Sequence, residues 1–442
     1  SCRALRSPDP YLYIKVAAVC LNLWTVYLFV SLLVMLAASV PIFIALCGSV
    51  TASFLLFSNM DTTIIIQRMF AVINKFSLMS IPLFVLAANL MSEGGISKRI
   101  INLANAFVGH IPGGLGMTAI LASMFFGAIS GSSPATVVAI GALLYPAMIE
   151  KGYSKEFSAG VITAAGSLGI IIPPSVNMIV YGTVTGASVG ALFMSGFGAG
   201  IVYGLSFVVY TFFYAKRHPE IQRETRKTWG ERLVAIKESI WGMGVPIIIL
   251  GGIYGGVFTP TEAAAVAAVY SIVVSLFVYR ELNFKGFINC VLKSAETTIQ
   301  VMILLAAASV FAFILTSEGI TVAIADAVLG VSSKKAVILL MMNIILLIGG
   351  MFMDGASLTT ILGPLFLPIA QSAGIDIVHL GIVMVVNAAI GMFTPPFGLN
   401  LFVAASITKQ PMLKVAKGAM PFILMSLIAL LIITYVPEIS LW

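Results

Sequence analysis

Long apolar stretches recur along almost the whole chain, from Trp24 to Tyr435. Many are long enough to supply the roughly 20 residues that a membrane-spanning helix needs. Of the 442 residues, 60% are hydrophobic and only 9% are charged, whereas soluble domains carry about 25% charged residues. This composition excludes an ordinary cytosolic enzyme, a disordered chain and a nucleic-acid-binding protein. We therefore expect an all-α polytopic membrane protein with the lipid bilayer around it.

A basic stretch divides the chain near its middle. Seven of the 24 basic residues lie from Lys216 to Lys237, and four glutamates, at positions 220, 224, 231 and 238, lie within this run or directly after it. The glutamates argue against a nucleic-acid patch, whereas an excess of lysine and arginine in a short loop marks the cytoplasmic side of a membrane protein. We expect residues 216–240 to be a cytoplasmic linker between two repeats, 23–215 and 241–442.

Cysteine and histidine are too few and too scattered for a metal or redox site. The cysteines at positions 2, 20, 47 and 290 show neither pairing nor ligand spacing. The three histidines, at positions 110, 218 and 379, lie far apart, and no HExxH motif occurs. We expect no disulfide framework, no transition metal, no organic cofactor and no enzymatic activity.

The two halves carry the same motifs in the same order. The matched pairs are SEG (92–94) with SEG (317–319), GSSPAT (131–136) with GASLTT (355–360), Pro146 with Pro368, Gly152 with Gly374, and GIIIPP (169–174) with GMFTPP (391–396). Apolar segments interrupted by Gly and Pro at corresponding positions of two halves indicate the binding site of a secondary transporter.

These breaks also have a direct chemical consequence. Non-helical backbone at membrane depth is tolerated only where protein or a water-filled cavity surrounds it. Each Pro-Pro pair removes two amide donors and leaves carbonyls without helical partners. Free carbonyls and nearby hydroxyls are ligands for a small alkali cation, and the helix N-termini that follow offer amides to an anion. A single Pro-Pro pair is often only a kink, but two matched pairs favour a binding centre.

Asp354 is the most informative single residue, because no lysine or arginine lies between Lys335 and Lys409. An intramembrane carboxylate is costly and by default functional. Aspartate is also a good cap for a helix that begins at Gly355, so both roles stay open. Asn177 and Asn400 follow the two Pro-Pro pairs, and each amide can contact substrate or satisfy an orphan carbonyl.

Arginine is absent from the segments that carry these breaks. None occurs between Arg99 and Arg217, and none after Arg280. An anion in the central loops must therefore be held by amides, hydroxyls and bound cations. Two amphipathic stretches, 60–76 and 97–110, mix single charges with apolar stripes and fit either interfacial or ordinary connecting helices.

Four runs resemble the large, DctM-type membrane subunit of tripartite ATP-independent periplasmic (TRAP) transporters: SKRIINLANAFVGHIPGGLGMTAILASMFFGAISGSSPATVVAIG, ITAAGSLGIIIPPSVNMIVYG, GGIYGGVFTPTEAAAVAAVYS and GMFTPPFGLNLFVAA. The resemblance covers nearly the whole chain from about Trp24. It implies a multi-pass protein of the bacterial inner membrane that takes up an organic carboxylate, of the C4-dicarboxylate or sialic acid class, with Na⁺ as the coupling ion.

The resemblance also implies the fold and the site. The fold is the ion-transporter-superfamily elevator, with two inverted repeats, re-entrant hairpins, broken helices, and a scaffold that includes about 23–57 and 241–281. The implied sodium ligands are Ser130, Ser132, Gly169, Ile172, Pro173, Gly350, Gly391, Thr394 and the carbonyl of Phe397. The implied substrate-binding residues are Ser132, Thr136, Ser175, Asn177, Asp354 and Asn400.

The implied partners are a small membrane subunit, separate or fused upstream, and a periplasmic substrate-binding protein. The first 15 residues lack a signal-peptide pattern and an initiator Met, and we expect residues 1–22 to be a tail or a connecting segment of such a fusion. The alternative is a self-sufficient carboxylate carrier or antiporter of the same fold that needs no binding protein.

Overall fold

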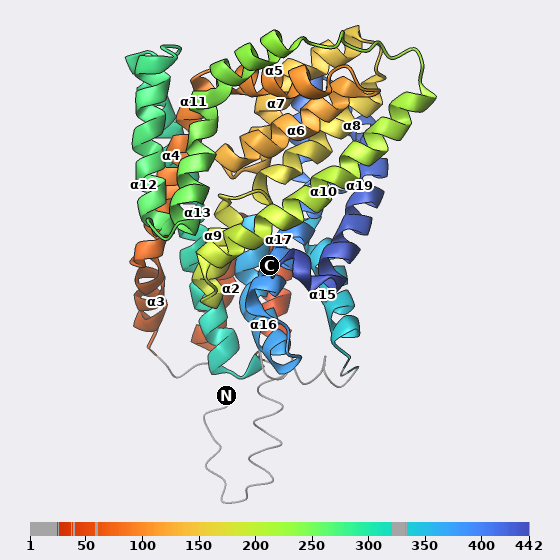
Figure 1. Ribbon diagram of the computed structural model, residues 1–442. Coiled ribbons are helices and arrows are strands. Elements are labelled where there is room, and N and C mark those ends of the chain that lie inside the picture. The colour runs from red at the N-terminus through yellow and green to blue at the C-terminus, as the bar shows by residue number, and fades with distance from the viewer. Residues whose placement is uncertain are drawn as a thin grey trace, which may run out of the picture.

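A computed structural model describes Trp24 and residues 26–36, 38, 40–57, 61–320, 332 and 334–441 (Figure 1). These residues form helices and connecting turns and contain no β-strand. Within this described part, seven helical segments are long and apolar enough to cross a membrane: Phe76–Glu93, Ser133–Glu150, Val189–Arg217, Trp229–Tyr254, Pro260–Val278, Phe284–Ser317 and Met412–Tyr435. The expected all-α membrane protein is confirmed. The tail at 1–22 lies outside the described residues.

Two helical hairpins approach the middle of the molecule from opposite ends (Figure 1). The first hairpin joins α6 (Gly114–Ser130) to α7 (Ser133–Glu150), and the second joins α15 (Lys335–Gly350) to α16 (Gly355–Ser372). The first turns at Gly131, whose φ of 59° favours glycine. The second turns at Asp354, whose side chain caps α16. Local chemistry thus sets both tips.

Two helices are broken at the Pro-Pro pairs. The first consists of α8 (Lys155–Gly166) and α9 (Val176–Thr185), with a 3₁₀ turn at Ser167–Ile170 between them. The second consists of α17 (Ile377–Gly391) and α18 (Leu399–Thr408). Proline cannot donate a backbone hydrogen bond, so each helix stops before its pair and restarts after it. The breaks lie beside the hairpin tips.

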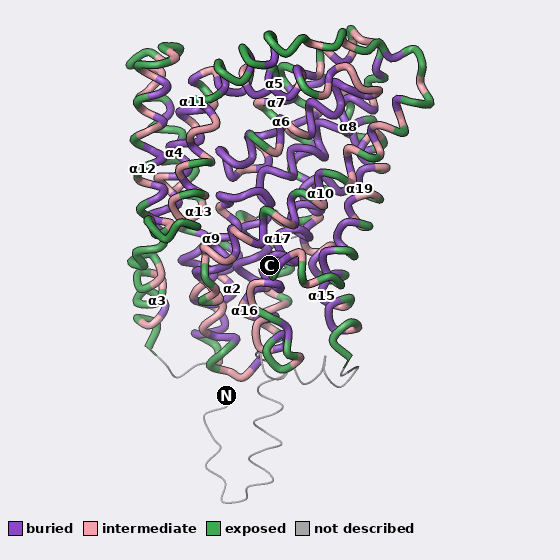
Figure 2. Tube along the Cα trace, viewed as in Figure 1, coloured by how far each residue is buried: buried purple, intermediate pink, exposed green. Residues whose placement is uncertain are grey.

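Further helices of the described residues flank these four elements. They are α2 (Ile42–Phe57), α3 (Thr63–Ile73), α4 (Ser80–Glu93), α5 (Ile96–Val108), α10 (Val189–Arg217), α11 (Trp229–Tyr254), α12 (Pro260–Val273), α13 (Phe284–Ser317) and α19 (Met412–Tyr435). Burial is concentrated in the hairpins and broken helices, whereas the outer helices expose many apolar side chains (Figure 2). Exposed apolar residues on spanning helices are the expected surface toward lipid.

The non-helical segment between the two halves is shorter than the predicted linker at 216–240. Helix α10 continues to Arg217, and α11 begins at Trp229, so only 218–228 is non-helical. Thr228 and Glu231 form a capping box that fixes the start of α11. The loop lies at the upper end of the molecule in Figure 1, on the side from which the first hairpin enters.

Candidate functional site

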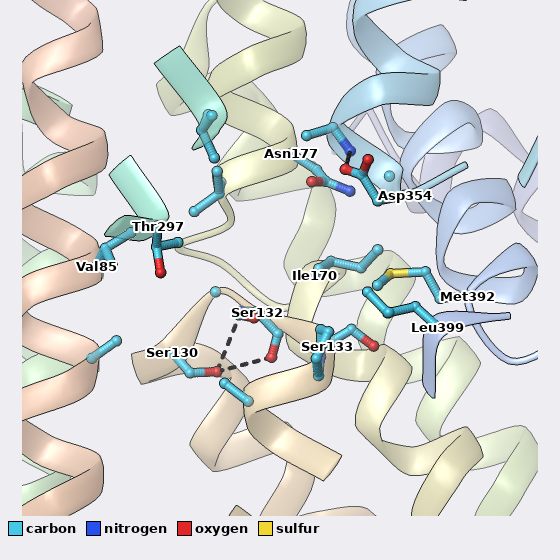
Figure 3. Close-up of a pocket in the computed structure, with 18 of the residues that line it drawn as sticks. Val85, Ser130, Ser132, Ser133, Ile170, Asn177, Thr297, Asp354, Met392 and Leu399 are labelled. Carbon is cyan, nitrogen blue, oxygen red and sulfur yellow. Dashed lines mark hydrogen bonds between the residues drawn. The ribbon is translucent and has the colours of Figure 1, made fainter. Parts of the chain in front are cut away.

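A cavity of about 380 Å³ lies where the two hairpin tips meet. We call it the central cavity. Its walls come from the two hairpins, the restarts of α9 and α18 at the two breaks, and the outer helices α4 and α13 (Figure 3). Its polar lining residues are Asn89, Ser92, Ser130, Ser132, Ser133, Asn177, Thr297, Gln300 and Asp354. Segments more than 200 residues apart thus line one space.

The first hairpin tip gathers oxygen atoms. The Thr136 hydroxyl donates to the Ser132 carbonyl at 2.8 Å, and the Ser130 and Thr136 hydroxyls lie 3.1 Å apart. Gly169 packs directly against this group, since a Cβ there would lie 2.5 Å from Thr136 Oγ1 and 2.6 Å from the Ser132 carbonyl. Only glycine permits this approach. Three residues of the first predicted sodium site, Ser130, Ser132 and Gly169, therefore lie together. Thr136, which was predicted to bind substrate, lies beside them.

The remaining members of that predicted set lie in the same break. Ile172 is buried and its amide donates to the Leu168 carbonyl at 2.9 Å. Pro173 follows it and carries no amide donor. Both residues contribute carbonyl oxygens to the segment beside Gly169, which is the kind of ligand that the sequence predicted.

At the second break, two glycines approach each other closely. A Cβ on Gly391 would lie 2.5 Å from the Cα and the carbonyl oxygen of Gly350, so the ends of α15 and α17 touch through their backbones. The Thr394 hydroxyl is buried and donates to the Ile390 carbonyl at 2.7 Å. Phe397 is exposed, and its ring lies 5.7 Å from that of Phe352. Neither Thr394 nor Phe397 lines the central cavity.

Asp354 combines the two roles that its sequence position left open. Its carboxylate accepts hydrogen bonds from the amides of Ala356 at 3.0 Å and Ser357 at 3.2 Å, and also from the Ser357 hydroxyl. It therefore caps α16. The same residue is half-buried in the wall of the central cavity (Figure 3), where it is the one carboxylate among the residues that line it.

Asn177 is the least satisfied polar side chain of the site. It is 5% exposed, and its Nδ2 has no hydrogen-bond partner among the described residues. It lies in the first turn of α9, close to Gly355, and reaches the cavity near Asp354 (Figure 3). A buried amide donor without a partner costs about 1–3 kcal/mol, so a ligand that accepts from it would be favoured.

Three predicted substrate residues are buried behind the cavity wall. Thr136 and Ser175 are fully buried and bond to backbone carbonyls of their own segments. The Asn400 amide contacts the Ser133 hydroxyl at 2.7 Å and donates to the Thr163 carbonyl at 3.2 Å. Asn400 thereby ties α18 to the first hairpin and to α8. None of the three lines the central cavity in this conformation.

The outer wall is the part that sequence reasoning missed. Asn89 and Ser92 of α4, and Thr297 and Gln300 of α13, face the hairpin tips. The Asn89 amide also donates to the Ser294 hydroxyl at 2.8 Å, which links α4 to α13. Polar residues spaced three apart within apolar helices were the available signal. Both helices also lie outside the ranges expected for the scaffold.

An all-helical bundle with seven membrane-capable segments and a polar cavity between interrupted helices defines the class of membrane transport proteins. Comparison with known proteins gives the family. Residues 29–439 match the family described as the DctM component of the tripartite ATP-independent periplasmic transporter. The chain therefore belongs to the TRAP large permease family, as its motifs predicted, and it is a multi-pass inner-membrane protein.

Relatives carry the same description. The C4-dicarboxylate TRAP transporter large permease protein DctM of Pseudomonas aeruginosa is 44% identical over 90% of this chain and 92% of its own length. The isethionate TRAP transporter permease protein DctMQ of Oleidesulfovibrio alaskensis is 44% identical over 92% of this chain, which spans 64% of that protein. The ectoine TRAP permease TeaC of Halomonas elongata is 37% identical. These relatives are permeases, so the expectation that the chain is not an enzyme is confirmed.

Solved structures support the fold. The YdaH transporter of Alcanivorax borkumensis superposes with a TM-score of 0.57 over 87% of this chain and 90% of that one, at 14% identity. At this identity the likeness concerns the fold alone.

Proposed function

We propose that the chain is the sodium-coupled transport subunit of a TRAP system that takes up an organic carboxylate, with the central cavity as its substrate site. The observation that carries the proposal is the meeting of both hairpin tips and the restarts of both broken helices at one cavity with polar groups in its walls. Irregular backbone at membrane depth is tolerated where it is buried in protein or lines a cavity, and in transporters such breaks form the binding site.

The composition of the cavity supports cation coupling. None of the described residues that line it is a lysine or arginine, and Asp354 contributes a negative charge. A dianion placed beside this carboxylate would be repelled. Bound Na⁺ at the oxygen groups around Ser130 and Gly350 would supply the missing positive charge, while the amide of Asn177 and the amides at the hairpin tips would donate to the anion.

The arrangement also supports an elevator mechanism with two inverted repeats. The hairpins enter from opposite ends (Figure 1), and the hairpins and broken helices face α4 and α13 across the cavity. Movement of this inner group along α4 and α13 would carry the cavity from one side of the membrane to the other. By the positive-inside rule, the side with the 218–228 loop is cytoplasmic.

The relatives narrow the substrate and the partners. Two C4-dicarboxylate permeases, from Pseudomonas aeruginosa and Vibrio cholerae, are 44% and 43% identical to this chain, which favours a C4-dicarboxylate over sialic acid. The family description names one component of a tripartite system. The other two components are a small membrane subunit, separate or fused, and a periplasmic binding protein.

Uptake into proteoliposomes tests the proposal. The chain and its small subunit are reconstituted, and uptake of labelled succinate, sialic acid and isethionate is measured with and without candidate binding proteins, under an imposed Na⁺ gradient. We expect Na⁺-dependent uptake only with a binding protein. Uptake that does not depend on the binding protein would identify a self-sufficient carrier. Uptake that does not depend on the Na⁺ gradient would reject sodium coupling.

A further inference from the structure

A second cavity of about 680 Å³, here called the outer cavity, lies below the central one. Its walls come from α3, the end of α9, the C-terminal part of α13 and one face of α16. These elements occupy the lower half of Figure 1, opposite the basic 218–228 loop. The outer cavity therefore faces the periplasmic side in the orientation proposed above.

The charge of the outer cavity differs from that of the central cavity. Among the described residues that line it, Arg68 and Lys75 are the charged ones. The Arg68 guanidinium lies 4.3 Å from the centroid of the Phe313 ring on the cavity wall, and the Lys75 ammonium donates to the Thr183 carbonyl at 2.9 Å. Neither side chain pairs with a carboxylate from any described residue.

The position of these two cations calls for a function. Lysine and arginine are disfavoured in periplasmic segments of inner-membrane proteins. Contacts with Phe313 and Thr183 direct both side chains across the cavity toward α13 and α9. Ser309, Thr316, Thr360 and Gln371 add neutral hydrogen-bonding groups to the same walls. This is a lining that suits a carboxylate.

The outer and central cavities share three helices, α9, α13 and α16. Residues 297–301 of α13 line the central cavity and 308–317 line the outer one, so their nearest lining residues are seven positions, or about 10 Å, apart along the helix. The N-terminus of α16 lines the central cavity at 354–356, and Thr360, Pro364 and Gln371 further along it line the outer cavity. The second hairpin thus borders both cavities.

We infer that the outer cavity is a second anion site, where Arg68 and Lys75 hold the carboxylate before it reaches the central cavity. The inference rests on the proposed function for the identity of the anion. Arg68 would supply the arginine that the segments around the Pro-Pro breaks lack. Cations in a concave site raise the local concentration of anions, and this effect weakens as salt is added.

Transport kinetics give the first test. In the reconstituted system, R68Q and K75Q should each raise the KM for the transported carboxylate about tenfold at low ionic strength and change Vmax less than about twofold. R68K should keep most of the affinity. K334Q is the matched control, since Lys334 is exposed at the start of α15 on the same side but does not line the cavity. An unchanged KM in R68Q and K75Q, or an equal effect of K334Q, would overturn the inference.

A chemical probe tests the site without transport. The four native cysteines are replaced by serine, Thr316→Cys is introduced in the outer cavity, and its rates of modification by an anionic and a cationic methanethiosulfonate reagent are compared. We expect the ratio of the anionic to the cationic rate to fall about tenfold when R68Q and K75Q are added, and succinate to slow modification. This result would stand even if Na⁺-driven uptake failed. A ratio that the two substitutions leave unchanged rejects the site.

The same probe distinguishes a dissolved carboxylate from a lipid phosphate. The measurement is repeated in vesicles of zwitterionic lipid and in vesicles that also contain anionic lipid. Equal ratios and equal protection by succinate in both support a carboxylate site. A fall in the anionic rate that appears only with anionic lipid would assign the two cations to lipid headgroups and overturn the inference.

Discussion

The two roles of Asp354 can be separated by substitutions that keep or remove the helix cap. Asparagine caps helices about as well as aspartate, and one amide oxygen can accept the bonds from Ala356 and Ser357 that the carboxylate accepts now. D354N therefore removes the charge and keeps the cap. D354A removes both and should lower the free energy of unfolding by about 1 kcal/mol, within a range of about 0.5–2 kcal/mol.

If the charge serves transport, D354N should raise the Na⁺ concentration that gives half-maximal uptake by about 10- to 100-fold. This range corresponds to the loss of about 1.5–3 kcal/mol of attraction between the Asp354 carboxylate and a bound Na⁺. Thermal unfolding in detergent should match that of the wild type. Wild-type uptake and Na⁺ dependence in D354N, together with a destabilised D354A, would show that Asp354 is a cap and nothing more.

Three further predictions concern the residues around the breaks. S130A and T394A should each weaken Na⁺ dependence several-fold without reducing membrane insertion, because each removes a hydroxyl oxygen; unchanged Na⁺ titrations of uptake would contradict the proposed sites. N400A removes the side chain that bonds to the Ser133 hydroxyl and the Thr163 carbonyl, so it should lower the free energy of unfolding by about 1–3 kcal/mol. N400Q, compared at equal expression, should restore only part of this stability. G391A should cost about 1–3 kcal/mol through overpacking against the end of α15, so normal stability and uptake would exclude the close backbone contact.

Much of the architecture follows from local chemistry that is visible along the chain. Apolar composition requires the backbone to satisfy its own hydrogen bonds, which yields helices. Gly131 and Asp354 fix the hairpin tips because one adopts a left-handed conformation and the other caps the next helix. The Pro-Pro pairs end α8 and α17 before the breaks, since proline has no amide to donate. The resemblance to the TRAP large permease family, confirmed by comparison, rests on these same motifs.

Other features depend on which helices pack together. Asn89 and Gln300 face the hairpin tips only because α4 and α13 pack beside them. Asn400 meets Ser133 across 267 residues of sequence, so it is a link between elements as well as a polar residue after a break. Hydrogen-bonding capacity can be read from a residue type, but its partner is set by the fold.

The sequence by itself determined the membrane class and the repeated breaks in the two halves. Glycine and proline change the backbone conformation only over a few neighbouring positions, so their effect can be predicted without knowing which other segments pack against them. The tertiary structure decided which broken ends meet, which outer helices complete the central cavity, and that Arg68 and Lys75 share a second one. Those outcomes arise from packing between segments that are distant in the chain, and no local pattern specifies them.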